Sequence, residues 1–256
     1  MARVIAIANQ KGGVGKTTTA INLSSALTKF GKKVLLLDMD PQGNAGYGVG
    51  IDSGSAEKTM LGVLRKEYSV KEAIVPTAFG QLDMIPSNLT LASLEASLFQ
   101  QPVERPFLLL KEAMGDILPH YDYIIIDCPP SLGLLSLNAL AFSNSVLIPV
   151  QCEYFAMEAV AAILSTISQV QKGENPNLKI EGFLLTMYDS RTQLGTEIAT
   201  EVRKLFKENT FLVSIPRNQS VAESQARQQP VTAFRPSSSG AQAYFSLARE
   251  VLDHDR

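Results

Sequence analysis

Two lysines and three glycines fall within six residues, in the stretch KGGVGK from Lys11 to Lys16. Glycines let a backbone turn sharply, so that its N–H groups face phosphate oxygens, and the N-terminus of a following helix adds a positive end. A β-rich run, Val4–Ala8, precedes the stretch, and a segment with helical spacing, Lys16–Phe30, follows it. Strand, glycine loop and helix in this order are the context in which a P-loop binds nucleotide phosphates.

The polar side chains at the end of the loop have separate expected roles. Lys16 reaches the β- and γ-phosphates, the Thr17 hydroxyl binds Mg²⁺, and Thr18 contacts the α-phosphate. Gln10 stands where the usual pattern begins with glycine, yet the GKT sequence is intact. The nucleotide-binding residues expected in the loop are Lys11, Gly12, Gly13, Val14, Gly15, Lys16, Thr17 and Thr18.

Aspartates follow two of the apolar runs that are typical of buried strands. LLLDMDPQGN ends one run with Asp38 and Asp40, and YIIIDCPP ends another with Asp127. A single aspartate after a strand is usually a turn former or a helix cap. The carboxyl ends of parallel strands meet at one edge of a sheet, however, and the P-loop lies at that edge. We therefore expect Thr17, Asp38 and Asp127 to hold Mg²⁺, and Asp40 to serve the metal shell or the attacking water.

One absence near Asp127 bears on the rate of the reaction. The residues that follow it are Cys128, Pro129 and Pro130, so the glutamate that some ATPases use there as a general base is missing. We therefore expect slow hydrolysis, below about one turnover per second, which suits a timer or a switch.

Lys11 has two open interpretations at this point. It stands at the start of the loop, so its side chain is free to leave its own site and reach the phosphates of a second copy, as an arginine finger does. The alternative is an ordinary solvated lysine in a loop, and spacing alone does not choose between the two.

Apolar runs of strand length alternate along the chain with longer helical segments. Continuous apolar strands are buried on both faces, which predicts an α/β fold with a mainly parallel sheet and helices on both sides. The expected strands are Val4–Ala8, Val34–Asp38, Tyr123–Asp127, Ser145–Val150, Ile180–Met187 and Thr210–Pro216, with an extra strand at Gln81–Ser87. The expected helices after the first are Leu132–Phe142, Phe155–Gln171, Thr196–Glu208 and Ala241–Leu252.

Composition narrows the class of protein. The 256 residues carry a net charge of -2, and 45% are hydrophobic, which is ordinary for a water-soluble protein. We expect one domain over residues 1–256, since no linker or repeat divides the chain. The two cysteines, Cys128 and Cys152, form no metal-type spacing and indicate buried thiols in a reducing cytoplasm. We find no signal peptide and no run of about 20 apolar residues.

The motifs together resemble those of the ParA/Soj partition ATPases, a deviant Walker A group that also includes MinD. The resemblance runs from Arg3 to about Leu252, through KGGVGKTT, LLLDMDPQGN, YDYIIIDCPPSLG, PVQCEYFAMEAV, LLTMYDSRT and SIPRN. It implies a P-loop NTPase fold in which Lys11 is the signature lysine that crosses a dimer interface to the partner's nucleotide. It also implies that Asp40 is linked to hydrolysis, so the expected catalytic residues are Lys11, Lys16 and Asp40.

The resemblance implies a working cycle with ATP and Mg²⁺ as cofactors. ATP builds a sandwich homodimer, the dimer binds DNA without sequence preference, and a ParB-type partner stimulates hydrolysis and releases it. The expected location is the cytoplasm, in association with the nucleoid. The alternatives are a ParA-like ATPase that positions a protein cargo, with weak or no DNA binding, and a cytosolic ATP-gated scaffold with little turnover.

The resemblance also places the adenine near IPRN. Pro216 and Asn218 are therefore expected base contacts, and Met187 either packs on the ring or belongs to the core. The expected DNA contacts are Arg191, Arg217 and Arg227.

The chain departs from the family after IPRN. The family continues with a basic residue and a SEAPS.GK-like segment, whereas this chain reads QSVAESQARQQP. Ser220 replaces the basic residue and the lysine is absent, which weakens the case for DNA binding but not for ATP binding. For Arg203, Lys204 and Lys207 we expect an ordinary solvated helix face.

Two other relatives fit less well. The C-terminus, YFSLAREVLDHDR, contains acidic residues and lacks the basic amphipathic helix of MinD-like proteins, so we expect no membrane binding. Cys128 and Cys152 do not match the cluster ligands of nitrogenase-type iron proteins.

Overall fold

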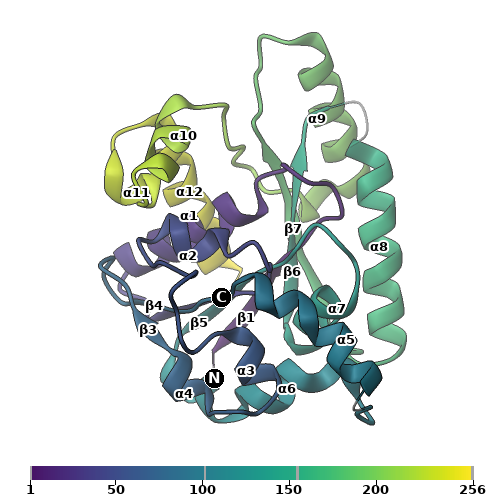
Figure 1. Cartoon of the computed structure of the whole chain (residues 1–256). Helices are drawn as coiled ribbons and strands as arrows, with labels where there is room; N and C mark the ends of the chain where they lie inside the picture. Colours follow the sequence, from purple (N-terminus) through teal and green to yellow (C-terminus); the bar gives the residue numbers. More distant parts are fainter. Residues whose placement is uncertain (1, 101, 154–155, 255–256) are drawn as a thin grey trace.

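The computed structural model describes residues 2–100, 102–153 and 156–254, whose strands form one seven-stranded sheet (Figure 1). The strand order is β3-β4-β2-β5-β1-β6-β7, and every neighbouring pair is parallel except β3 with β4. The predicted mainly parallel sheet is therefore confirmed. The strands are β1 (Arg3–Ile7), β2 (Val34–Asp38), β3 (Val75–Pro76), β4 (Leu82–Ile85), β5 (Tyr123–Asp127), β6 (Ser145–Gln151) and β7 (Lys179–Thr186).

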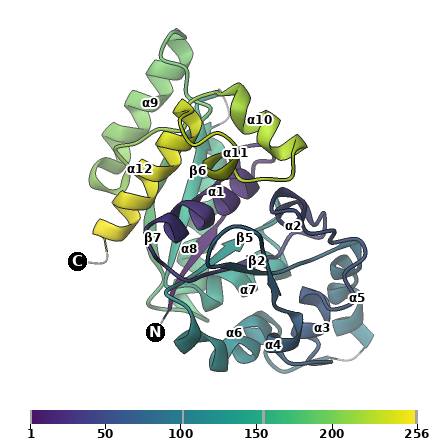
Figure 2. The ribbon, with the colours of Figure 1, turned by 90° about the vertical axis from the view of Figure 1, so that its left-hand side faces the viewer.

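Helices pack on both faces of the sheet because successive strand residues point to opposite sides. In β1, Val4 and Ala6 join one apolar core, whereas Ile5 and Ile7 join the other. The first core includes residues of α3 (Met60–Leu64), α4 (Val70–Ala73), α5 (Ser93–Gln100), α6 (Leu109–Met114), α7 (Leu134–Phe142), α8 (Ala156–Lys172) and α9 (Gln193–Phe206). The second includes residues of α1 (Lys16–Lys29), α2 (Asn44–Gly48), α11 (Val231–Phe234) and α12 (Ser239–Asp253). Figure 2 shows α1, α11 and α12 grouped together, away from α3, α4 and α6.

Most predicted elements are present with small shifts at their ends. Gly31 ends α1 as expected: its φ is +76°, and the Lys32 N–H behind it donates to the Leu27 carbonyl at 3.2 Å. Within the described residues α8 begins at Ala156, and Phe155, the predicted first residue, lies outside them. The predicted extra strand is also present, as β4, which pairs with β2.

The predicted strand Thr210–Pro216 is wrong. Only isolated bridges occur there, Phe183 with Thr210 and Tyr188 with Pro216. The backbone N–H groups of Leu212 and Val213 donate instead to the Glu250 carboxylate on α12, at 2.7 and 2.8 Å, so they form no ladder. Leu212 is consequently 87% exposed, despite lying in an apolar run.

Candidate nucleotide-binding site

The glycine loop between β1 and α1 takes the conformation that its sequence predicts. Gly13 and Gly15 have φ values of +74° and +89°, in the left-handed region that glycine adopts without strain. Gly15 is the residue before the first turn of α1, and its carbonyl accepts from the Thr19 N–H at 2.8 Å. The backbone N–H groups of that turn therefore face the loop opening, where an anion would be stabilised.

Two buried hydrogen bonds hold the loop to the sheet. The Thr186 hydroxyl, at the end of β7, donates to the Val14 carbonyl at 2.8 Å. The Asn9 amide donates to the Pro149 carbonyl at 2.7 Å, and its oxygen accepts from the Lys11 N–H at 3.0 Å. The loop is thus tied to β6 and β7, and Val14 lies beneath it, 1% exposed.

Lys16 lies over the loop that precedes it. Its Nζ donates to the Lys11 carbonyl at 3.1 Å, and the residue is 7% exposed. Burial lowers the pKa of the Lys16 ammonium, while the neighbouring Asp127, Cys128 and Asp40 act in the opposite direction. A buried ammonium beside converging backbone N–H groups is suited to bind phosphate oxygens.

The carboxylates of Asp38 and Asp127 stand at the ends of paired strands, as predicted. Asp38 of β2 is in register with Asp127 of β5, and both are 0% exposed. The Asp38 oxygens accept from the backbone N–H groups of Asp40 and Ala45, at 3.0 and 3.1 Å. Burial, opposed by these bonds, raises the pKa of Asp38 to about 7.

Asp127 differs from Asp38 in having no hydrogen-bond donor on either oxygen among the described residues. Burial holds its pKa well above the usual range, and the charge of Asp38 adds to the effect. The Thr17 hydroxyl faces Asp127 and lowers that pKa, although the two groups do not meet the geometry of a hydrogen bond. A buried carboxylate without a donor requires an explanation, such as a bound ion.

Thr17 and Asp127 fit a Mg²⁺ ion. Both supply hard oxygen atoms, and Mg²⁺ in nucleotide sites is typically held by one or two protein oxygens together with phosphates and waters. Among residues 2–100, 102–153 and 156–254, no group of three or more His, Cys, Asp or Glu side chains forms an all-protein metal cage. Asp38 is engaged with the backbone, so its predicted place among the ligands stays a prediction.

A cavity of about 600 Å³ opens at this edge of the sheet. It brings together most of the predicted nucleotide-binding residues with Asp40, which is 8% exposed and accepts from the Gln42 N–H at 2.9 Å. The predicted residues that line it are Gly12, Gly13, Gly15, Lys16, Thr17, Thr18, Asp40, Met187, Pro216, Arg217 and Asn218. Val14, Asp38 and Asp127 are buried behind the lining, and Lys11 is not part of it.

The far end of the cavity is formed by the segment IPRN and the end of β7. The Ile215 N–H donates to the Leu185 carbonyl at 2.8 Å, and the Tyr188 N–H donates to the Ile215 carbonyl at 3.0 Å. Between these two contacts Met187 has a φ of +50°, an uncommon conformation for a residue with a side chain. Met187 lines the cavity and belongs to neither apolar core of the described residues.

Lys11 points toward its own chain's Glu153. The Nζ atom of Lys11 lies 3.1 Å from Oε2 of Glu153, just beyond the end of β6, and the two side chains are 25% and 48% exposed. Lys11 is not part of the lining of the nucleotide cavity. Contact with a second copy stays a prediction.

Several residues of the cavity were missed from the sequence. Gln42 and Asn44 belong to the DMDPQGN motif, which was a usable signal. Thr186 and Gln225 carried no local signal, because their contacts with the glycine loop and α1 join residues 172 and 207 positions apart. The other lining residues outside the predicted set are Pro130, Ile215, Val221, Ala222 and Tyr244.

The three arginines predicted to contact DNA have different surroundings. Arg191 is bound to Asp189 by two side-chain hydrogen bonds, at 2.8 and 2.7 Å, and the pair lowers the pKa of Asp189 to about 2. Arg217 lines the nucleotide cavity, and Arg227 is the exposed residue at the end of α10 (Gln219–Ala226). Arg203, Lys204 and Lys207 are exposed, as expected for a solvated face.

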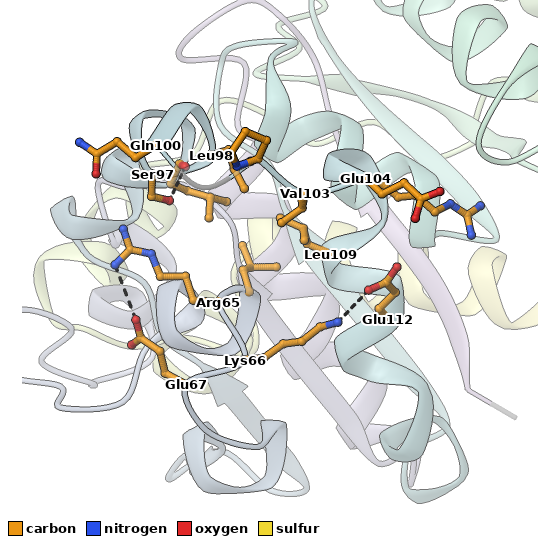
Figure 3. A pocket seen from close by; sticks show the side chains of 14 residues that line it. Arg65, Lys66, Glu67, Ser97, Leu98, Gln100, Val103, Glu104, Leu109 and Glu112 are labelled. Atoms are coloured by element: carbon orange, nitrogen blue, oxygen red, sulfur yellow. Dashed lines mark hydrogen bonds and ion pairs between the residues drawn. The ribbon is translucent and has the colours of Figure 1, made fainter.

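A second hollow, of about 880 Å³, lies among α3, α5, α6 and residues 102–105. Figure 3 shows Lys66 extending to Glu112 and Arg65 to Glu67, with N–O distances of 2.8 and 3.6 Å. The hollow includes no residue of the glycine loop and none of Asp38, Asp40 or Asp127. The smaller cavity is therefore the candidate nucleotide site.

The remaining sequence predictions concern the thiols and the C-terminus. Cys128 and Cys152 are both free and buried, as expected, and burial raises the pKa of the Cys152 thiol to about 11. The apolar side of α12 packs into the second core through Tyr244, Leu247 and Val251. Among the helices of the described residues, none combines the length and the apolar character needed to cross a bilayer.

Comparisons with known proteins agree with this geometry. The AAA domain family model matches residues 2–180. The chain is 47% identical over 251 residues to the sporulation initiation inhibitor protein Soj of Bacillus subtilis, covering 98% of each chain. It is 46% identical over 253 residues to the chromosome partitioning protein ParA of Myxococcus xanthus, covering 99% of this chain and 89% of the relative.

A solved structure agrees over the full length. Cobyrinic acid a,c-diamide synthase from Mycobacterium smegmatis, with bound ATP analogue and magnesium, superposes with a TM-score of 0.88 at 39% identity, covering 100% of this chain and 96% of the other. Sequence and structural similarity thus extend across the glycine loop, the aspartates and the C-terminal helices, and the chain belongs to the Soj/ParA family of chromosome partitioning ATPases.

Proposed function

We propose that this protein is a Mg²⁺-dependent ATPase that acts as a switch in chromosome or plasmid partitioning. The observation that carries the proposal is a glycine loop ending in the buried Lys16, beside the buried and unpartnered carboxylate of Asp127. The Myxococcus relative is a chromosome partitioning protein, and the Mycobacterium structure contains an ATP analogue and magnesium.

The nucleotide is held by residues from both ends of the cavity. Lys16 and the N–H groups of the loop bind the β- and γ-phosphates, and Thr18 binds the α-phosphate. Met187, Pro216 and Asn218 enclose the adenine at the far end. Thr17 and Asp127 hold Mg²⁺, which neutralises the phosphate charge when it is bound.

Hydrolysis is slow because the site lacks a strong general base. Asp40 lines the cavity, where it orients the attacking water, and its carboxylate accepts from the Gln42 N–H. Cys128, which follows Asp127, is 0% exposed, and burial holds the pKa of its thiol above the usual value. A thiol in that state remains protonated at neutral pH and does not replace the missing glutamate.

The active unit is an ATP-dependent homodimer. Lys11 leaves Glu153 and binds the phosphates of the partner subunit, where a phosphate chain with several negative charges offers a stronger attraction than one exposed carboxylate. The nucleotide thereby joins two copies, and hydrolysis separates them. A ParB-type partner protein stimulates this step.

DNA is the expected track of the dimer, in the cytoplasm and over the nucleoid. Arg217 and Arg227 are exposed and supply positive charge near the nucleotide cavity, and Arg191 supplies more once a phosphate displaces Asp189. The overall charge of -2 and the altered stretch 219–230 reduce this attraction. The alternative is a ParA-like ATPase that positions a protein cargo with little or no DNA binding.

One experiment separates the two functions. Sedimentation and binding to a random-sequence duplex are measured together in Mg-ATP and in Mg-ADP, at low and moderate salt. ATP-dependent dimers that bind DNA and release it as salt rises would support the partition switch. ATP-dependent dimers that ignore DNA would support the protein-cargo function, and a monomer in saturating Mg-ATP would refute both.

A further inference from the structure

The segment in which this chain departs from its family forms a wall of the nucleotide cavity. Residues 219–226 fold as α10, and Val221, Ala222 and Gln225 line the cavity from that helix. Gln225 lies four residues after Val221 and three after Ala222, so it shares a side of the helix with each of them. Part of α10 thus lies across the cavity from the glycine loop, where water would otherwise be.

A hydrogen bond joins this wall to the first turn of α1. Nε2 of Gln225 donates to Oγ1 of Thr18 at 2.7 Å, across 207 positions of sequence. The contact places α10 directly against the residue that follows the GKT lysine and its threonine.

The helix that presents Gln225 is firmly anchored. Asn218 caps α10 by accepting from the Ser220 N–H at 2.9 Å, and its amide donates to the Ser239 hydroxyl at 2.7 Å. Arg235 donates to the Ser220 hydroxyl at 3.1 Å. Ser224, one residue before Gln225, is 1% exposed and bonds to the Val221 carbonyl. A side chain on such a support loses little freedom when it forms one more bond.

The direction of the bond matters for the ligand. The Gln225 amide donates and the Thr18 oxygen accepts, so the hydrogen of the Thr18 hydroxyl remains free to donate. A phosphate oxygen is only an acceptor, so it requires a donor. With Gln225 as the donor, the hydrogen of the Thr18 hydroxyl stays available to an anion. The same bond restricts rotation of the hydroxyl, which would otherwise let this hydrogen point away from the anion.

We propose that Gln225 is a positioning residue for nucleotide binding, which orients the Thr18 hydroxyl toward the phosphate nearest the ribose. The role rests on the proposed function, because it assigns no ligand other than that nucleotide. ATP and ADP both contain this phosphate, so Gln225 strengthens the binding of both by the same factor. The α10 wall thereby contributes to affinity without touching the γ-phosphate.

The test is a double-mutant cycle on the full chain. The measured quantities are the dissociation constants of fluorescent ATP and ADP analogues at equilibrium. Gln225→Ala removes one neutral hydrogen bond and is expected to weaken both ligands by about threefold to tenfold. Gln225→Glu removes the donor and adds a negative charge near the phosphates, so its loss is expected to exceed tenfold. In a Thr18→Val background, Gln225→Ala is expected to change either affinity by less than about twofold.

The control variant lies on the same helix. Gln219 is also exposed, and its amide bonds to Glu223 at 2.7 Å instead of to the loop, so Gln219→Ala is expected to leave both affinities unchanged. Unchanged binding in Gln225→Ala, or an equal loss with and without the Thr18 hydroxyl, would overturn the positioning role while leaving the ATPase intact. Failure of the unmodified protein to bind either nucleotide would instead refute the proposed function, and this role with it.

Discussion

Replacing the buried Asp127 with asparagine should stabilise the nucleotide-free protein while removing its metal site. Both carboxylate oxygens of Asp127 lack a donor among the described residues, and burial keeps its pKa well above 3.8. Asparagine has nearly the same shape and no charge. The substitution therefore removes the cost of burying an ionisable group, and it breaks no hydrogen bond to Asp127 from the described residues.

The magnitude follows from proton linkage. In the pH range between the unfolded and folded pKa values, the folded state holds a proton that the unfolded chain has released. The free energy of unfolding therefore falls as pH rises, by up to about 1.4 kcal/mol per pH unit for one carboxyl group. The cost of burying Asp127 therefore grows with pH over this range, and each change of about 1 kcal/mol shifts the melting temperature by roughly 2–4 °C in a chain of this size.

The assay is thermal unfolding in EDTA without nucleotide, at pH 6, 7 and 8. At pH 8 the free energy of unfolding of Asp127→Asn is expected to be higher than that of the unmodified protein by about 1–3 kcal/mol. At pH 6 the difference between the two proteins is expected to be smaller. In Mg-ATP the order reverses, because a ligand at about 1,000 times its dissociation constant stabilises the unmodified protein by about 4 kcal/mol, more than the advantage of the variant. The variant gains little from Mg-ATP.

Asp38 supplies the matched control. Its oxygens accept from two backbone N–H groups, so Asp38→Asn places an amide donor against one of them. At pH 6, below its pKa of about 7, this variant is expected to lose about 1–3 kcal/mol. An Asp127→Asn protein that is less stable than the unmodified one at pH 8 would show that the Asp127 carboxylate has a partner, and the reasoning would be refuted.

Four further outcomes follow from the site. Lys16→Ala is expected to weaken ATP binding more than 100-fold by calorimetry, since it removes a buried ammonium from the phosphates; retained affinity would contradict the P-loop role. Asp40→Ala is expected to hydrolyse ATP more slowly and to sediment as a dimer in Mg-ATP; a monomer would argue against a role in water activation. Arg191→Ala is expected to weaken binding to all duplex sequences and reduce the salt slope by about one, measured by anisotropy; an unchanged slope would move the site elsewhere. Glu153→Gln frees Lys11 from an exposed pair and is expected to tighten the ATP dimer by up to about fivefold in sedimentation, whereas a weaker dimer would assign Glu153 to the interface.

Most of the fold was predictable because its signals are local. The runs VLLLD and YIIID are buried along their whole length, as continuous apolar strands in a parallel sheet must be. Asp38 and Asp127 lie side by side at the ends of these two strands, and this could be predicted without knowing how the helices pack. The glycine loop was equally predictable, because Gly13 and Gly15 adopt φ values that other residues avoid.

The errors and omissions arise from contacts between distant segments. Thr210–Pro216 has the composition of a strand, yet Glu250 of α12 takes the N–H groups that a ladder would need. Gln225 has no motif around it, and only packing of α10 places it on Thr18. The place of Asp38 among the metal ligands stays a prediction, although its oxygens accept from the backbone N–H groups of Asp40 and Ala45.

The segment from Thr210 to Pro216 also protects the sheet from other molecules. β7 is an edge strand, and an exposed edge is a template for pairing with strands of neighbouring chains. Phe211 and Ile215 donate their N–H groups to the carbonyls of Phe183 and Leu185, so two acceptors of β7 are already covered. The covering segment cannot extend the sheet itself, because Glu250 occupies the N–H groups of Leu212 and Val213. One carboxylate on α12 thus keeps the covering segment from presenting a free strand edge of its own.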